Sequence, residues 1–436
     1  MLALDDYPGR YALSNELHAR PFPELRAPCR AAMLAIKQEG TAAERDRGAD
    51  RAHLVALLDR YGAAHPAPGA SHWTGALGKA VLTWEMHAEF VTYTIFADSG
   101  RGGAFSDEAL RHFPADWLSQ APGRVVTASL VWVQPVTPEE EARVLARDLP
   151  EWFVPESLAV SRVSEGDAVI AGDFRIDAGG TTRFAVLCRP DIGPRRLGRI
   201  VQRLLEVEIY KSMAMLTLPR AREVAAAVAR IDRDLTDSVA AMAAAAGQEG
   251  ATLDRLLKIA AELELLASDT AFRFGAAGAY EAIVGQRIGV MREERIPGRQ
   301  LLAEFMLRRF DPAMRTCRSA KARLDELSDR AGRAANLLRT RVDVANQAQN
   351  VEVLRAMDRR AALQLRLQET VEGLSVVAIS YYGVSLLAGV VAPFGERFGW
   401  SRAGLVAGMT VPVVLLVWYL VRRIRARISH RADAQS

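Results

Sequence analysis

Acidic and imidazole side chains alternate along one β-branched, aromatic stretch, where they could hold a metal ion. The stretch Val81 to Phe96 predicts one long strand with a bend or bulge midway. Alternation along a strand places Glu85, His87 and Glu89 on one face. With His18 nearby, two imidazoles and two carboxylates would suit zinc or another divalent cation, the one cofactor that the sequence suggests. The alternative is a polar strand face whose side chains pair with arginines.

A second group of charged residues lies on one predicted helix, from about Arg195 to Thr217. Arg199 and Arg203 are four residues apart, and Glu206 follows Arg203 by three. These spacings favour pairing within the helix or with a packed neighbour. We interpret this group as a structural polar network, made of Arg199, Arg203, Glu206 and Glu208.

A third pattern lies in an apolar segment near the C-terminus. Small and hydroxyl residues recur there at helical spacing, just after an acidic residue, at Glu372, Ser375, Tyr382, Ser385 and Gly389. In a symmetric oligomer this stripe would line a pore, with a ring of carboxylates at its entrance that attracts cations. The alternative is that small residues only allow helices to pack closely in lipid.

Sequence motifs of common enzymes are absent, so the chain favours a function other than catalysis. It has no GxxxxGK[ST], GxGxxG, HExxH, GxSxG or CxxC pattern. Cys29, Cys188 and Cys317 are scattered, as is typical of reduced thiols in the cytoplasm. The net charge of +4 is modest and the arginines alternate with acids, which does not indicate binding to nucleic acid.

Two apolar stretches predict a membrane hairpin. Leu374 to Phe394 and Gly404 to Val421 carry no charge, and each approaches the roughly 20 residues that cross a bilayer as a helix. Arginines cluster after the second stretch, at Arg422, Arg423, Arg425, Arg427 and Arg431. Because basic residues stay in the cytoplasm, we expect a bacterial inner-membrane protein with both termini cytoplasmic.

The remaining chain predicts α+β organisation followed by helices. Further strands are expected at Val125 to Val133, Ala168 to Ile176 and Thr181 to Cys188, and separate helices at Thr252 to Leu266 and Thr270 to Glu294. The expected segments are a mixed α/β domain (1–194), a helical bundle (195–311), a long stalk helix (312–373), a first membrane helix (374–394), a periplasmic loop (395–403), a second membrane helix (404–421) and a basic cytoplasmic tail (422–436).

The stalk carries an apolar seam that must be covered. Its members recur at spacings of three and four, at Leu324, Leu327, Ala331, Ala334, Leu338, Val342 and Ala345. The seam lapses from Asn346 to Asn350 and resumes at Leu354. A lone helix cannot bury such a stripe, so we expect both packing by the preceding helices and association of copies.

This order of elements resembles the CorA superfamily of magnesium channels. The resemblance implies a pentamer whose first membrane helix lines the pore. The Gly-Met-Asn motif of that superfamily, at the outer end of the first span, is missing, because this loop reads PFGERFGW. Tyr382 to Ser385 is similar to the Tyr-Gly-Met-Asn form but lies inside the span, and Gly408 to Thr410 lies in the second helix.

Several short sequence segments are similar to those of a bacterial family of uncharacterised membrane-anchored proteins, domain of unknown function 3422. The segments that carry this resemblance are Asn15 to Pro21, Trp84 to Phe90, Asp173 to Asp177, Gln202 to Glu208 and Val371 to Tyr382. They span nearly the full chain. The resemblance implies a membrane-anchored protein and supplies no activity.

Three functions follow as hypotheses. The first is an oligomeric, CorA-like cation conduit that lacks the Gly-Met-Asn motif. The second is a membrane-anchored scaffold or sensor whose cytoplasmic domain holds a protein partner. The third is a metal-dependent enzyme that uses His18, His87 and Glu89.

Overall fold

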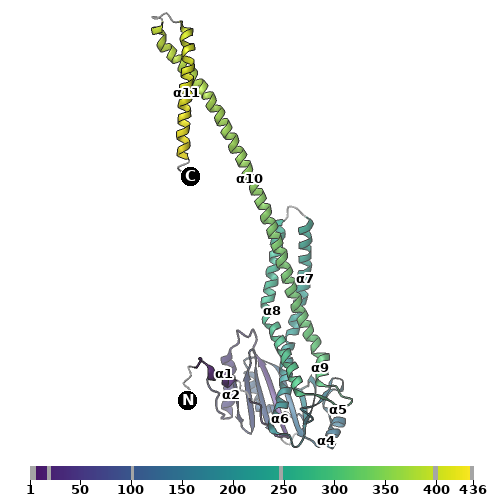
Figure 1. Cartoon of the computed structure of the whole chain (residues 1–436). Helices are drawn as coiled ribbons and strands as arrows, with labels where there is room; N and C mark the ends of the chain where they lie inside the picture. Colours follow the sequence, from purple (N-terminus) through teal and green to yellow (C-terminus); the bar gives the residue numbers. More distant parts are fainter. Residues whose placement is uncertain (1–5, 17–20, 100–102, 245–248, 396–400, 433–436) are drawn as a thin grey trace. The chain divides into compact units, whose positions relative to one another are not determined.

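The computed structural model describes residues 6–16, 21–99, 103–244, 249–395 and 401–432. The chain divides into two compact units, Met1–Ala335 and Asn336–Ser436, and each is described here by itself (Figure 1). The first unit contains a mixed sheet followed by helices, as the sequence predicts. The second is helical.

One sheet of nine strands organises the first unit, in the order β2-β3-β4-β1-β5-β8-β7-β6-β9. Only the β5–β8 pair is parallel, and the other pairs are antiparallel. The strands are β1 (Cys29–Lys37), β2 (His72–Leu77), β3 (Ala80–Met86), β4 (Val91–Asp98), β5 (Arg124–Pro135), β6 (Ala159–Val163), β7 (Ala168–Ile176), β8 (Thr182–Cys188) and β9 (Glu294–Arg295).

Helices cover both faces of the sheet. On one face, α2 (Arg47–Arg60) and α3 (Ala115–Ser119) pack on the first strands around Trp84, Tyr93 and Trp117, none of which is exposed. A second cluster on the later strands includes Val144 and Leu149, which belong to the π-helical turn Val144–Asp148 and to α5 (Leu149–Trp152). Because side chains alternate along a strand, the remaining β1 and β5 residues face the opposite layer.

The opposite layer is made by α6 (Pro194–Met215), which contacts β5. Glu208 of α6 is 1 % exposed, and its Oε1 accepts a hydrogen bond of 3.0 Å from the Thr127 hydroxyl on β5. Central strand β1 is therefore buried on both faces, which explains why small residues such as Ala31 and Ala35 occupy it.

The remaining helices of the first unit are α1 (Arg10–Glu16), α4 (Pro138–Arg143), α7 (Thr217–Ala244), α8 (Glu249–Met291), α9 (Leu302–Arg309) and the start of α10 (Asp311–Gly395), with 3-10 turns at Leu110–His112 and Pro155–Ser157. Helices α7 and α8 run side by side (Figure 1). The predicted break between Leu266 and Thr270 is wrong, since α8 is continuous. The Thr270 hydroxyl donates to the Leu266 carbonyl at 2.7 Å, one turn back, so its hydrogen-bonding requirement is met within the helix.

The single long strand expected from Val81 to Phe96 is also wrong. The chain turns at residues 87–90, where the His87 amide donates to the Phe90 carbonyl at 2.9 Å, and β3 and β4 pair antiparallel on either side. No glycine or proline marks the turn. Its stability comes instead from burial of Phe90, which is not exposed, and from contacts made by its polar residues.

Three other predicted strands are confirmed by β5, β7 and β8. Helix α4 begins with a reciprocal capping box, formed by the side chains of Thr137 and Glu140. The stalk expected from 312 onward is part of α10, which has 85 residues and continues through Asn346 to Asn350.

The stalk seam is covered by earlier helices over its first part. Leu324, Leu327 and Ala331 are all buried within the first unit. Arg330 of α10 donates to Asp232 of α7 at 2.8 Å, and Arg318 pairs with Glu281 of α8. Further along, Leu354 is 63 % exposed in the single chain, so the later part of the seam is not covered.

The second unit ends with the carboxyl-terminal part of α10 and α11 (Arg402–Ala432), which pack on each other. Ser380, Val384 and Ala388 of α10 are buried, as are Leu405 and Val413 of α11. A side chain at Gly383 would lie 3.3 Å from Val413 Cγ1, which shows how closely the two helices approach.

Candidate functional site

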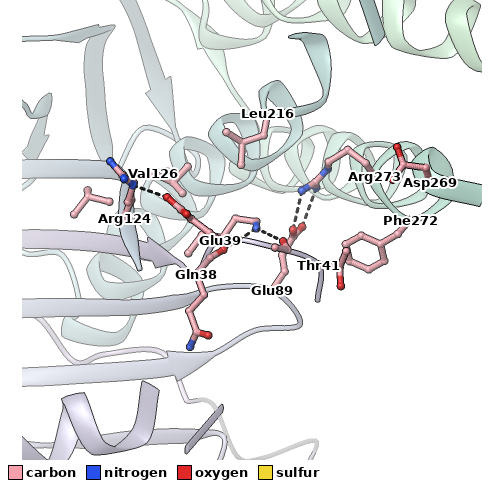
Figure 2. Close-up of a pocket in the computed structure, with 13 residues that line it drawn as sticks. Gln38, Glu39, Thr41, Glu89, Arg124, Val126, Leu216, Asp269, Phe272 and Arg273 are labelled. Atoms are coloured by element: carbon pink, nitrogen blue, oxygen red, sulfur yellow. Dashed lines mark hydrogen bonds and ion pairs between the residues drawn. The ribbon is translucent and has the colours of Figure 1, made fainter. Parts of the chain in front are cut away.

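The turn between β3 and β4 presents a carboxylate to a buried cluster on α8. Glu89 is 2 % exposed, and its two oxygens accept hydrogen bonds from the Arg273 guanidinium at 2.7 and 2.8 Å (Figure 2). The Tyr280 hydroxyl donates to the same carboxylate at 2.8 Å. Burial, and then the neighbouring carboxylate, raise the pKa of Tyr280, so its hydroxyl stays a donor.

The same turn is held from its other side. Arg45 forms a buried ion pair with Asp50 of α2, and another of its nitrogens donates to the His87 carbonyl. The His87 ring stacks on Phe90 with 4.2 Å between centroids, and its Nε2 lies 3.3 Å from the Thr92 hydroxyl. The turn therefore joins α2, the sheet and α8 through charged hydrogen bonds.

A pocket of about 540 Å³ opens beside this turn. Its basic side chains are Lys37, Arg124 and Arg273, and its acidic ones are Glu39, Glu89 and Asp269 (Figure 2). Its apolar part includes Val125, Leu216 and Phe272, which are 40 to 49 % exposed. The pocket thus offers an apolar wall next to balanced charges, a surface suited to an amphipathic ligand or peptide.

Lys37 is the basic group of this pocket whose contacts are to backbone. Its ammonium donates to the carbonyls of Gln38 at 3.0 Å and Gly40 at 3.2 Å. Burial lowers the pKa of Lys37, and the more distant Glu89 carboxylate opposes that effect. Neither Lys37 nor Arg273 carries a local sequence signal. Arg273 belongs to α8 and lies 184 residues after its partner Glu89 in the chain.

The residues expected to bind a metal are only partly described. His18 lies outside the described residues. Glu85 belongs to β3, whereas His87 and Glu89 lie in the turn, so strand alternation does not place the three on one face. Within the described ranges, no group of three or more His, Cys, Asp or Glu side chains is arranged to hold a metal ion.

The predicted polar network on α6 separates into distinct contacts. Glu206 pairs with Arg287 of α8, and Glu208 accepts from Thr127, Lys211 and Ser212. Arg203 donates to the Val290 carbonyl at 3.2 Å. Arg199 and Arg203 both line a pocket, together with Arg196, at the amino-terminal half of α6.

The residues expected to line a pore lie mostly on one face of α10. Tyr382 is 66 % exposed in the single chain, and Ser375 and Gly389 are exposed too. This face is centred about 160° around the helix from the one buried against α11, at about 100° per residue. Ser385 lies at the boundary, since it is exposed but also lines a groove between α10 and α11. Glu372 accepts from Gln368 at 3.3 Å.

The hydroxyl of Ser375 bonds its own helix. It donates to the Val371 carbonyl at 2.8 Å, and Thr410 of α11 does the same to Val406 at 2.7 Å. Hydroxyls satisfied in this way are compatible with a lipid environment.

Helices α10 and α11 each contain a stretch that is long and apolar enough to cross a membrane. Only 17 % of that stretch in α10 and 11 % in α11 is buried within the chain. The core helix of a soluble protein would be mostly buried, so length, composition and exposure together hint at association with a membrane.

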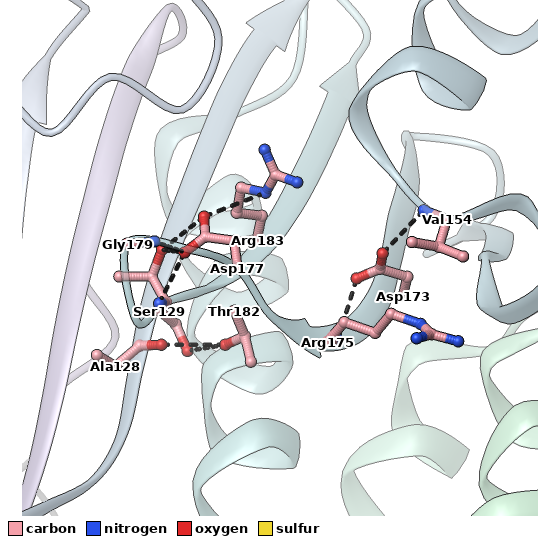
Figure 3. Close-up of polar contacts among 10 residues, drawn as sticks. Ala128, Ser129, Val154, Asp173, Arg175, Asp177, Gly179, Thr182 and Arg183 are labelled. Carbon is pink, nitrogen blue, oxygen red and sulfur yellow. Dashed lines mark hydrogen bonds and ion pairs between the residues drawn. The ribbon is translucent and has the colours of Figure 1, made fainter.

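The segment Asp173 to Asp177 shows how a polar motif can be structural. Asp173 accepts from the amides of Val154 at 2.9 Å and Arg175 at 3.1 Å (Figure 3). Phe174, which lies between Asp173 and Arg175, has a φ of 56° at the point where the register of β7 with β8 shifts. Asp177 accepts from the amides of Gly179 and Thr181 and closes the turn to β8. These carboxylates hold a bulge and a turn.

The fold and these contacts define a protein with an α/β domain and two helices capable of crossing a membrane. The chain belongs to the family described as Protein of unknown function (DUF3422), whose model matches residues 5–428. No curated protein matches the chain. Four of the segments that suggested this family are at least partly accounted for by the contacts above, namely those around Glu89, Asp173, Glu208 and Ser375.

Proposed function

We propose that this chain is an integral protein of the bacterial inner membrane, held there by the α10–α11 hairpin. The carrying observation is that the two apolar stretches remain largely exposed while packing on each other. Backbone groups in hydrocarbon must be satisfied within the helices, and a helical hairpin meets that requirement. The arginines from Arg422 onward, next to the second span, support a cytoplasmic position for both termini, because basic residues near membrane helices favour the cytoplasmic side.

Copies of the chain associate through the exposed face of α10 and enclose a cation conduit. With α11 covering one side of α10, the opposite face carries Ser375, Tyr382 and Gly389 and is available to neighbouring copies. A ring of Glu372 carboxylates at the inner end would concentrate cations. By likeness to the CorA architecture the ring is a pentamer, although the Gly-Met-Asn filter is missing and no magnesium selectivity is implied.

Two neighbouring tyrosines provide the sharpest test. Tyr381 and Tyr382 lie at one depth but about 100° apart around the helix, and only Tyr381 lines the groove facing α11. In liposomes, Tyr382→Cys should react with a membrane-impermeant, charged thiosulfonate, and the reaction should block cation flux. Tyr381→Cys is the matched control and should stay unmodified. Cys29, Cys188 and Cys317 are buried, so background labelling should be small.

The charge of the entrance is tested separately. Glu372→Gln should lower cation flux without changing the size of the particle measured by native mass spectrometry. Stable oligomers without flux, or equal labelling of Tyr381→Cys and Tyr382→Cys, would contradict a conduit. A monomer in mild detergent would contradict the association itself.

A second candidate function is a membrane-anchored scaffold or sensor. The pocket beside Glu89 favours it, because Phe272 and Leu216 stand exposed next to Lys37 and Arg273. This function predicts a protein partner that co-purifies with the full chain and is lost in Phe272→Asp. Exposed Phe22, which is 41 % exposed outside that pocket, offers a matched control as Phe22→Asp. Retention of the partner in both variants would count against this surface.

A further inference from the structure

Four arginines converge on an open pocket at the amino-terminal half of α6. The pocket has a volume of about 390 Å³, and its basic residues are Arg196, Arg199, Arg203 and Arg292. The first three come from α6, and Arg292 follows the end of α8. The turn between β6 and β7 supplies Ser164 and the one lining carboxylate, that of Glu165.

The positive charge of this pocket is only partly neutralised. Glu165 binds both Arg196, at 3.0 Å, and Arg292, while Asp167 binds Arg196. Two carboxylates therefore serve four guanidinium groups, which leaves two positive charges in excess. The nearby Arg287 is already paired with Glu206, and Arg195 with Glu24, so neither pair changes this balance.

Arg199 and Arg203 carry the excess. Arg203 has a backbone carbonyl as its partner and stands over the Phe22 ring, 5.9 Å from its centroid. Burial, followed by the charges of Arg199, Arg287 and Arg292, lowers the pKa of Arg203. Across the ranges that the structure describes, Arg199 has no hydrogen-bond or ion-pair partner. Guanidinium groups left half-buried among like charges lack the anion that would satisfy them.

The backbone around the pocket adds to the same field. Helix α6 begins at Pro194 with no acidic residue in its first turn, so the positive end of its dipole is not offset. Arginine provides planar, forked donors that match the oxygens of a phosphate group. A volume of this size admits a phosphate together with a small attached group.

We propose that this pocket binds the phosphate group of a phosphomonoester, with Arg199 and Arg203 as its main donors and Arg196 and Arg292 as partners shared with Glu165. The phosphate belongs either to a small soluble molecule or to the headgroup of a lipid. Binding here does not depend on the conduit or on the partner surface beside Glu89.

The test uses the full chain in phosphatidylcholine nanodiscs and isothermal titration calorimetry. The probes are inorganic phosphate, glycerol 3-phosphate and water-soluble dihexanoyl phosphatidic acid, with dihexanoyl phosphatidylcholine as the lipid control. We expect glycerol 3-phosphate or the phosphatidic acid to bind at least about tenfold more tightly than inorganic phosphate. The tighter of the two identifies the source of the phosphate as a soluble molecule or a lipid.

Two neighbouring arginines on α6 give the matched variants. Arg199→Gln should weaken binding by about tenfold or more, since it removes a charged hydrogen bond. Arg195→Gln removes the same charge from the same helix, but Arg195 is paired with Glu24 on the surface and should leave the affinity within about twofold. The effects of both substitutions on the affinity should become smaller as the salt concentration is raised.

A gain of affinity separates binding from folding. Glu165→Gln frees Arg196 and Arg292 from a competing carboxylate and should tighten binding by several fold, an effect that damaged folding would not produce. The proposal is overturned if no probe gives a saturable binding isotherm, if Arg195→Gln weakens binding as much as Arg199→Gln, or if Glu165→Gln weakens it.

Discussion

The buried ion pair between Glu89 and Arg273 allows a quantitative prediction about what holds the β3–β4 turn to α8. Replacing Arg273 with methionine preserves much of the side-chain volume but leaves the Glu89 carboxylate, 2 % exposed, without its guanidinium. The Tyr280 hydroxyl alone remains to satisfy it. The carboxylate would then be a buried charge that keeps one of its three hydrogen bonds and loses the two from Arg273.

The magnitude follows from the burial of the two partners. Removing one member of a buried ion pair typically costs about 3–5 kcal/mol. The Arg273 side chain is 17 % exposed, so some water reaches the vacated space and the lower end, about 3 kcal/mol, is appropriate. In a domain of this size about 1 kcal/mol corresponds to roughly 2 °C in melting temperature, so Arg273→Met should melt about 6 °C below the wild type.

Thermal unfolding of the full chain in detergent, followed by tryptophan fluorescence, measures this change. Trp84 is fully buried in β3, close in sequence to the turn, and serves as a reporter. Combining Arg273→Met with Glu89→Gln removes the stranded charge and should recover at least half of the loss. Arg124→Met is the matched control, because Arg124 lines the same pocket in an exposed pair with Glu39 and should shift the melting temperature by less than about 1 °C.

The reasoning would be refuted by two outcomes. Arg273→Met could melt within about 1 °C of the wild type, in which case the pair does not hold the turn. Alternatively, the double variant could be no more stable than Arg273→Met, in which case the stranded carboxylate is not the cause of the loss.

Two further predictions concern the first unit. Gly198→Ala would place a Cβ atom 1.7 Å from the Pro23 carbonyl oxygen and should lower the stability by about 1–3 kcal/mol. Gly278→Ala in α8 has open space around its Cβ atom and should raise the stability by about 0.5–1 kcal/mol. Equal melting temperatures of the two variants would contradict the close approach at Gly198. Burial lowers the pKa of His53, so the unfolded chain takes up the proton first and stability should fall as the pH drops below about 6.5, until the folded imidazole also titrates. His53→Gln should flatten that dependence in pH-dependent melts, whereas Gln at the exposed His65 should leave it intact; an unchanged slope in His53→Gln would exclude this imidazole as its origin.

The hydrogen bonds of His53 also show what a second proton on its ring would disturb. Its Nε2–H donates to the Trp117 carbonyl at 3.0 Å, which leaves Nδ1 to accept from the Tyr93 hydroxyl at 3.1 Å. A second proton on Nδ1 would turn this acceptor into a donor, so the Tyr93 hydroxyl would have to rotate and its own proton would lose its acceptor.

Local sequence patterns predicted some strands and missed others for identifiable reasons. Strands β5, β7 and β8 contain β-branched residues and are predicted, whereas β1 contains three alanines, which favour helix by propensity. Alanine fits β1 because other elements pack on both faces of this strand. A short stretch of sequence does not reveal that packing. The turn at residues 87–90 was missed because it has no glycine or proline and depends on Arg45, Phe90 and Arg273.

The candidate site followed the same division. The sequence pointed to Glu89 as a chemically significant residue, but its partners are supplied by α8, far along the chain. Likewise, Arg199 and Arg203 stood out by spacing, while the pocket they form needs Arg292 and the β6–β7 turn. Periodicity reports which side chains share a face of one element and says nothing of what another element brings to it.

By itself, the sequence determined the two apolar helices, the long helix that precedes them, and the α/β character of the amino-terminal part. These features are local, since hydrophobic length and helical period are written in consecutive residues. Only the tertiary structure decided that Glu89 meets Arg273 rather than a set of histidines, and that four arginines gather at α6. Such pairings depend on how the sheet and its covering helices close around one core, and that packing is set by contacts between residues distant in the chain.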